Sequence, residues 1–164
     1  MTDFSHLPYR PCAGVMLVNR DGRVFVGQRL DSKLEAWQMP QGGIDPGEAP
    51  LDAAYRELWE ETGVAREHVE LVAEAPDELS YDLPDDLIGT VWKGKWRGQR
   101  QRWFLFRFLG QNDDVNIQTA EPEFRAWRWV EPSELPELIV PFKRDLYRQI
   151  LDIFADALGR AEKA

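Results

Sequence analysis

The segment from residue 40 to residue 64 constrains the fold more than any other part of the chain. It begins with Pro40 to Gly47, where three Gly and two Pro in eight positions demand an irregular but ordered loop. Good helix formers follow from Ala49 to Thr62, with apolar residues at helical spacing, and Gly63 stands where a helix would end. The sequence therefore predicts a loop that leads directly into a helix.

Apolar runs on both sides of this helix predict a sheet. Five strands are expected, at Val15–Val18, Val24–Val26, Val69–Ala73, Trp103–Leu109 and Phe124–Val130. Asn19–Arg23 contains an Asp-Gly pair and predicts a hairpin turn, while Asp31–Ala36 is expected to be loop. The Trp103–Leu109 run is apolar enough to be buried on both faces, whereas Phe124–Val130 has no cleanly apolar face.

The chain is expected to close with an amphipathic helix. This helix would begin at Pro141, repeat apolar side chains every four residues to Leu158 and end before Gly159, leaving Arg160–Ala164 as a charged tail. Strands, a helix, more strands and a second helix indicate an α+β or mixed-sheet sandwich. With 164 residues, of which 43% are hydrophobic, one domain spanning residues 1–164 is expected.

Composition narrows the chemistry. The formal net charge is −9, so a phosphorylated substrate would need bound or locally clustered cations. A single cysteine, Cys12, and two separated histidines, His6 and His68, argue against a disulfide framework and a zinc site. No leader pattern is present and the most apolar stretch, Cys12–Val18, is too short to cross a bilayer, so a cytoplasmic protein without membrane contact is expected.

Three glutamates on the predicted helix suggest a metal site. Glu57 precedes Glu60 and Glu61 by three and four positions, so the three carboxylates can project to one side within about one turn. Such a group repels itself unless a cation lies among its members, and oxygen donors of this kind suit Mg²⁺. The fork of Arg56 can orient a carboxylate such as Glu48. An acidic run is more often a solvated helix face, and it is the preceding loop that favours the metal site.

The same segment resembles the signature of the Nudix family. The pattern is Gly, five residues, Glu, seven residues, Arg-Glu, an aliphatic residue, any residue, Glu-Glu, any residue, Gly and an aliphatic residue. The fixed positions are filled by Gly42, Glu48, Arg56, Glu57, Leu58, Glu60, Glu61, Gly63 and Val64. Chance agreement is on the order of 10⁻⁹ per window.

The resemblance implies a fold, a cofactor and a set of catalytic residues. The fold would be an α/β/α sandwich around a mixed β-sheet, and the cofactor Mg²⁺, Mn²⁺ or another divalent cation. Glu57, Glu60 and Glu61 would hold the metal together with the Gly42 carbonyl, and Glu123 would hold metal or activate water. Together with Arg56 these carboxylates would be the catalytic residues, and water would attack phosphorus.

Likeness outside the signature points to one branch of the family. That branch contains bacterial RNA pyrophosphohydrolases and the similar dinucleoside polyphosphate hydrolases. By position, Arg10 and Phe142 match residues that flank a nucleobase, and Arg29, Gln99 and Lys143 match phosphate or base contacts. The loop before Trp37 departs from the branch pattern, with Ala36 where Ser is expected.

A basic stretch could also bind the substrate. Between Trp92 and Trp103 no acidic residue occurs, and the cations interleaved with Trp96 are Lys93, Lys95, Arg97, Arg100 and Arg102. This pattern suits a phosphate backbone with bases stacked alongside, but an ordinary solvated loop explains it equally well.

Three functions stay open at this point. The main expectation is an enzyme that converts 5′-triphosphate RNA ends to monophosphates and so initiates RNA decay. The alternative is a hydrolase that cleaves diadenosine tetraphosphate to ATP and AMP. A non-catalytic binding module is expected to lack signature carboxylates, and here none is missing.

Overall fold

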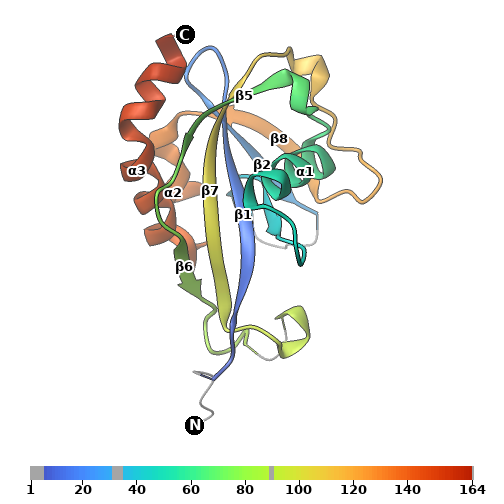
Figure 1. Cartoon of the computed structure of the whole chain (residues 1–164), viewed down its shortest axis with the longest axis vertical. Helices are drawn as coiled ribbons and strands as arrows, with labels where there is room; N and C mark the ends of the chain where they lie inside the picture. The colour runs from blue at the N-terminus through green and yellow to red at the C-terminus, as the bar shows by residue number, and fades with distance from the viewer. Residues whose placement is uncertain (1–5, 31–34, 89–90, 164) are drawn as a thin grey trace.

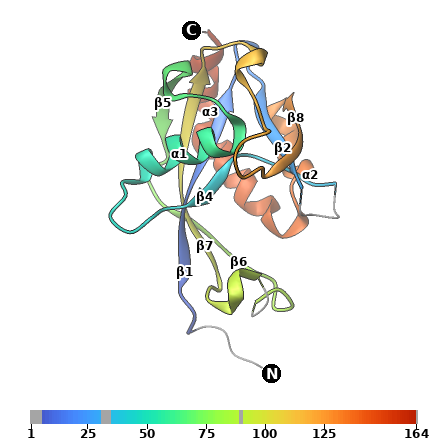
Figure 2. The same ribbon diagram turned by 90° about the vertical axis from the view of Figure 1, so that its right-hand side faces the viewer.

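A mixed eight-stranded sheet runs through the molecule, with helices on both of its faces (Figures 1 and 2). The computed structural model describes residues 6–30, 35–88 and 91–163. The strands are β1 (Tyr9–Val18), β2 (Val24–Arg29), β3 (Trp37–Gln38), β4 (Gln41–Gly43), β5 (Val69–Glu74), β6 (Leu79–Asp82), β7 (Gly98–Phe108) and β8 (Phe124–Val130). The helices are α1 (Pro50–Thr62), α2 (Leu135–Leu138) and α3 (Arg144–Lys163).

The sheet is mixed because its two longest strands run parallel. Strands follow the order β3-β2-β1-β7-β5, and β4, β6 and β8 pair with β1, β7 and β2. Tyr9 to Val18 of β1 pair in parallel with Gly98 to Arg107 of β7, whereas the other pairings are antiparallel. A parallel pair needs a long crossover connection, and α1 lies within it.

Alternation along β1 divides the core into two layers. Val15 and Leu17 are fully buried on the α1 side, where they pack with Leu58. Met16 is fully buried on the opposite side, in the layer that α3 covers with Ile150. Apolar layers therefore flank both faces of the sheet, and the predicted α/β/α sandwich is confirmed.

The expected elements are present, most of them longer than predicted. The hairpin turns through Gly22 at φ 79°, and Val18 pairs with Val24. The weakest prediction, Phe124–Val130, is a full strand because it pairs with β2 along its length. Its mixed faces are explained by Trp127, which stacks on Phe25 with ring centroids 5.5 Å apart.

The glycine-rich loop and the last helix also differ from the prediction, and the last helix begins at Arg144 instead of Pro141. The loop Pro40–Gly47 contains strand β4, which forms because Gln41 to Gly43 pair with β1. The last helix does not end before Gly159 but continues to Lys163, so the predicted tail from Arg160 is mostly helical. Of the predicted loop Asp31–Ala36, positions 31–34 lie outside the described residues.

Sequence patterns did not indicate β3, β6 or α2, which are two to four residues long. Within the described residues, no helix combines the length and the apolar character needed to cross a membrane.

Gly63 and Gly159 provide a matched test of the helix ends. Gly63 has φ 72°, and a Cβ there would lie 2.7 Å from the Asn116 carbonyl oxygen, whereas a Cβ at Gly159 meets nothing within 4 Å. We expect Gly63→Ala to lower the free energy of unfolding by about 2 kcal/mol. Gly159→Ala should raise it by about 0.5–1 kcal/mol, because Ala favours the helix. Urea denaturation measures both, and equal effects would contradict this description of the α1 end.

Candidate active site

Helix α1 is fixed at both ends, and this fixes the direction of its glutamates. Pro50 occupies the first turn, and at the other end the Gly63 amide donates to the Trp59 carbonyl at 2.9 Å. Ala54 and Leu58 are fully buried against the sheet. Since the apolar face of α1 packs against the core, the side chains of Glu57 and Glu61 are turned toward β4.

Glu57 and Glu61 are both removed from solvent. Glu61 is 4% exposed, and its Oε2 accepts a hydrogen bond from the Gln41 amide at 3.0 Å. The Glu57 side chain is 14% exposed and lies directly over Gly42, where any Cβ would overlap its carboxylate. Gly42 therefore allows a carboxylate to approach the backbone of β4.

Burial makes these carboxylates hard to ionise. Desolvation raises the pKa of Glu61 well above its usual range, and the charges of Glu57 and Glu123 raise it further. The Gln41 amide and the Arg29 guanidinium act in the opposite direction. Desolvation also raises the pKa of Glu57, against the lowering effect of Arg56. Two buried acids in this arrangement favour any cation that can reach them.

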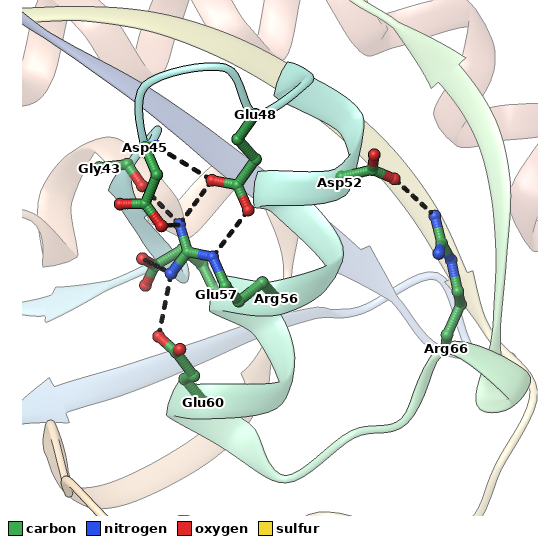
Figure 3. Close-up of polar contacts among 8 residues, drawn as sticks. All are labelled: Gly43, Asp45, Glu48, Asp52, Arg56, Glu57, Glu60 and Arg66. Atoms are coloured by element: carbon green, nitrogen blue, oxygen red, sulfur yellow. Dashed lines mark hydrogen bonds and ion pairs between the residues drawn. The ribbon is translucent and has the colours of Figure 1, made fainter.

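Arg56 organises the loop in front of the helix (Figure 3). Its Nε and Nη2 donate to the two carboxylate oxygens of Glu48, each at 2.9 Å, and Nη2 also donates to the Gly43 carbonyl at 2.8 Å. The Glu48 carboxylate also accepts from the Asp45 amide at 3.0 Å. These bonds, led by those from Arg56, lower the pKa of Glu48 to about 2. The expected Arg56–Glu48 contact is confirmed.

The same guanidinium also neutralises two of the signature glutamates. Arg56 Nη1 donates to Glu57 Oε1 at 2.8 Å and to Glu60 Oε2 at 3.2 Å. The Glu60 side chain is 47% exposed at the helix surface. As the side chains stand, no group of three or more His, Cys, Asp or Glu among the described residues is arranged to hold a metal ion. Metal binding by these glutamates would require their carboxylates to rotate.

Glu123 approaches this group from the residues directly before β8. It is exposed, and its backbone carbonyl accepts from the Leu30 amide at 2.9 Å, which holds the start of β8 beside the end of β2. Its charge acts on Glu61. The structure thus brings a residue far outside the signature close to the buried carboxylates.

The expected base-binding residues gather on the α3 side of the sheet. Arg10 and Gln99 are paired across β1 and β7, and Tyr81 of β6 pairs with Gln99. The Phe142 ring is 38% exposed, with its centroid 6.0 Å from that of Tyr81. Lys143 Nζ lies 5.0 Å from the Tyr81 ring centroid. Tyr81, which is 8% exposed, was missed because it stands in no recognisable motif.

The charge of Arg29 acts both on a buried signature carboxylate and on an expected base-binding residue. Its charge counteracts the raised pKa of Glu61 and, together with the larger effect of burial, lowers the pKa of Lys143 to about 8. Lys143 is therefore an ammonium that loses its proton more readily than usual. Cys12, also on this side, is fully buried, and burial raises the pKa of its thiol to about 11, so it is not a thiolate nucleophile at neutral pH.

A cavity of about 510 Å³ is lined both by signature residues and by one of the expected base-binding residues. Its walls include Arg10, Gly43, Asp45, Arg56, Glu57 and Trp96. An arginine of the base-binding group and a buried carboxylate of the signature therefore face the same space. Trp96 was expected only as a member of the basic stretch, and here it contributes an indole to the wall of the cavity.

Most of the basic stretch is neutralised by neighbouring acids. Three of its arginines form ion pairs across the sheet, Arg97 with Asp82 at 3.3 Å, Arg100 with Glu78 at 2.6 Å and Arg102 with Glu74 at 2.6 Å. Trp103 is 1% exposed and belongs to the core. The stretch is thus not the free basic surface that its sequence suggested.

Replacing Glu61 should stabilise the protein at neutral pH, where the buried carboxylate is costly to ionise. Because its pKa is raised in the folded state, wild-type protein in EDTA should lose stability as pH rises from the unfolded-state pKa through the folded-state pKa. We expect Glu61→Gln to be more stable than wild type by about 1–2 kcal/mol at pH 7 and equal to it at pH 4. Urea denaturation at both pH values tests this, with Glu67→Gln, an exposed position, as the control. A destabilised variant at pH 7 would contradict the description of Glu61 as a desolvated acid.

Comparison with known proteins places the chain in a family. A NUDIX domain model matches residues 8–150. An RNA pyrophosphohydrolase of Sphingopyxis alaskensis is 62% identical over 154 residues, covering 94% of this chain and 98% of the relative. An RNA pyrophosphohydrolase of Novosphingobium aromaticivorans is 60% identical over 157 residues, covering 94% of this chain and 98% of the relative. Among solved structures, an Ap4A hydrolase complex of C. elegans has a TM-score of 0.62 at 19% identity, covering 88% of this chain and 98% of that one. An E. coli dihydroneopterin triphosphate pyrophosphohydrolase has a TM-score of 0.65 at 22% identity, covering 87% and 96%. The chain therefore belongs to the Nudix family.

Proposed function

We propose that the chain is a metal-dependent pyrophosphohydrolase that converts 5′-triphosphate RNA ends to 5′-monophosphates. The observation that carries the proposal is the match, over nearly the whole length of both chains, to relatives named RNA pyrophosphohydrolase. The buried Glu57 and Glu61 beside a cavity that also reaches Arg10 support it, because hydrolysis of a polyphosphate needs charge neutralisation next to a nucleotide site. A cytoplasmic location and a role in starting RNA decay belong to this proposal.

The residues present fit a divalent cation. Glu57, Glu60, Glu61 and Glu123 offer oxygen donors, and the Gly42 carbonyl is a further candidate ligand, because the Glu57 carboxylate lies against Gly42. Desolvation and mutual repulsion of the buried acids are relieved by positive charge. When bound, Mg²⁺ or Mn²⁺ supplies charge neutralisation for phosphate oxygens and lowers the pKa of water.

Arg56 can release its glutamates without disturbing the loop. Only its Nη1 donates to Glu57 and Glu60, whereas Nε and Nη2 hold Glu48 and the Gly43 carbonyl. If both signature carboxylates rotate toward a cation, the guanidinium keeps its bidentate partner and the loop keeps its shape. Arg56 is thus a positioning residue in this proposal, and Glu123, whose charge acts on Glu61, would hold metal or accept a proton from water.

The α3 side of the sheet would bind the nucleotide. A base placed between the Arg10 guanidinium and the Phe142 ring would stack on both. Lys143 and Arg29 would neutralise phosphate charge, and Gln99 would donate to the base or to phosphate.

Cleavage of diadenosine tetraphosphate remains the alternative substrate reaction. The Ap4A hydrolase of C. elegans shares the fold at less than 25% identity and does not distinguish the substrates. A non-catalytic binding module is disfavoured because every signature carboxylate is present.

Loss of two signature glutamates should abolish both metal binding and hydrolysis. We expect Glu60→Gln combined with Glu61→Gln to lower the rate of pyrophosphate release from 5′-triphosphate RNA at least 100-fold, since two metal ligands are removed. Mg²⁺ should raise the melting temperature of the wild type but not that of the double variant. Glu67→Gln is the matched control and should behave as wild type. Normal activity of the double variant would exclude these side chains as ligands.

A substrate panel tests the reaction itself. Purified protein in Mg²⁺ is expected to convert 5′-triphosphate RNA to 5′-monophosphate RNA, with products identified by mass spectrometry. Diadenosine tetraphosphate, ADP-ribose and nucleoside triphosphates are assayed beside it. Cleavage of diadenosine tetraphosphate with the RNA left intact would replace the main proposal by its alternative.

A further inference from the structure

A second cavity, of about 500 Å³, lies at the C-terminal end of α1. One wall comes from the end of the helix, with Trp59, Glu60 and Gly63, and the other from residues 116–121. Trp59 is 58% exposed, although an indole buries a large apolar area when it packs. A large flat ring is thus left open to solvent beside a signature glutamate.

Hydrogen bonds hold the second wall in place. The Asn116 amide donates to the Thr62 carbonyl at 2.7 Å, and the Asn116 side-chain oxygen accepts from the Gln118 amide at 3.0 Å. A Cβ at Gly63 would collide with the Asn116 backbone, so the wall lies directly against the end of the helix. The cavity is therefore a formed feature of the fold.

The chemistry of the walls suits an uncharged planar ring better than a phosphate. Glu60 and Glu121 contribute carboxylates, and among the described residues that line the cavity none is Lys or Arg. Side-chain amides and the Thr119 hydroxyl provide hydrogen-bonding groups, and the Thr119 Oγ1 is buried without a hydrogen-bond partner in the described part of the chain. A nucleobase can stack on an exposed indole and use such groups at its edge.

The position of the cavity relates it to the phosphate site. Glu57 and Arg10 line the first cavity, of about 510 Å³, whereas Glu60 and Trp59 line the second. The two residues lie three positions apart on α1, roughly 4.5 Å along the axis. Glu121 is two residues before Glu123. A polyphosphate held at the signature glutamates would thus have one end facing Arg10 and the other facing Trp59.

We propose that the cavity between Trp59 and residues 116–121 is a subsite for the second nucleobase of a dinucleoside polyphosphate. The inference rests on the proposed pyrophosphohydrolase function and extends its range of substrates. A 5′-triphosphate RNA end carries nothing beyond its last phosphate and leaves this subsite unused. A dinucleoside polyphosphate places one base near Arg10 and Phe142 and the other against Trp59.

A matched pair of nucleotides isolates the subsite. Diadenosine tetraphosphate and adenosine 5′-tetraphosphate carry the same phosphate chain and differ by one adenosine. We expect Trp59→Ala to lower kcat/KM for diadenosine tetraphosphate about 10-fold, within a range of roughly 5- to 100-fold, because one base–aromatic stack is lost. The value for adenosine 5′-tetraphosphate and for 5′-triphosphate RNA should change less than about twofold.

Two further variants serve as controls. Trp59→Phe keeps an aromatic face and should retain most of the activity toward diadenosine tetraphosphate. Leu109→Ala removes another exposed apolar side chain, 48% exposed and outside both cavities, and should behave as wild type. Calorimetric binding of the two nucleotides in Ca²⁺, measured with wild type and Trp59→Ala, gives the same comparison without turnover.

The outcomes separate this inference from the proposed function. The subsite would be overturned if Trp59→Ala affected both nucleotides equally or affected neither. It would also be overturned if the wild type bound and cleaved diadenosine tetraphosphate no better than adenosine 5′-tetraphosphate. Each of these outcomes would leave the RNA reaction intact. A change in sedimentation of Trp59→Ala, with nucleotide binding unchanged, would also overturn it by showing that Trp59 belongs to a contact between copies. Failure of the wild type to cleave any member of the panel would instead overturn the proposed function.

Discussion

Burial of the carboxylates of Glu57 and Glu61 between α1 and β4 is the constraint on which the rest of the site depends. Taking an ionised carboxylate out of water costs several kcal/mol unless positive charge or hydrogen bonds replace the water. The packing of Leu58 and Ala54 on the sheet holds both acids at the buried side of α1, because they stand on the same helix. The surrounding elements are accordingly arranged to supply positive charge and amide donors.

The compensating groups come from four separate parts of the chain, one of which is Arg10 of β1, whose charge acts on Glu57. Arg56 reaches Glu57 from the helix itself, the Gln41 amide reaches Glu61 from β4, and the charge of Arg29 acts on Glu61 from the end of β2. None of these partners neutralises both acids. Gly42 matters for the same reason, since only a residue without a Cβ lets the Glu57 carboxylate lie against the backbone of β4.

The sequence predicted what is encoded locally. The end of α1 at Thr62 was predicted from Gly63 and is confirmed, whereas its start was predicted one residue early, because Ala49 is the N-cap and the helix begins at Pro50. Strand β4 was not predicted, because its Gln-Gly-Gly has no strand propensity and forms only by pairing with Cys12 to Gly14. Gly159 did not end α3, because a glycine is tolerated inside a long helix that packs through Ile150 and Phe154.

Long-range contacts account for the remaining differences at the site. The Arg56–Glu48 pair was predictable because only Ala49 and the first turns of α1 separate the two residues, and the signature fixes their spacing. The partners of Arg100 and Arg102 are Glu78, directly before β6, and Glu74 of β5, so these two charges are neutralised only once both strands pair with β7. Tyr81 was missed for the same reason, since its place beside Phe142 depends on the register of β6 against β7.

A chain of hydrogen bonds along one face of β7 connects a buried tryptophan to the residues beside Arg10. Alternate residues of β7 face α3, and the Trp103 indole donates to the Gln101 Oε1 at 2.7 Å, while the Gln101 Nε2 donates to the Gln99 Oε1 at 2.7 Å. An indole N–H can only donate, so the orientation of both amides is set from the buried end. Gln99, which is 1% exposed, therefore turns its amide oxygen toward Gln101, and that oxygen keeps one lone pair beside the two N–H groups of the amide. The polarity of Gln99 beside Arg10 is thus decided by a tryptophan in the core, four residues further along the strand.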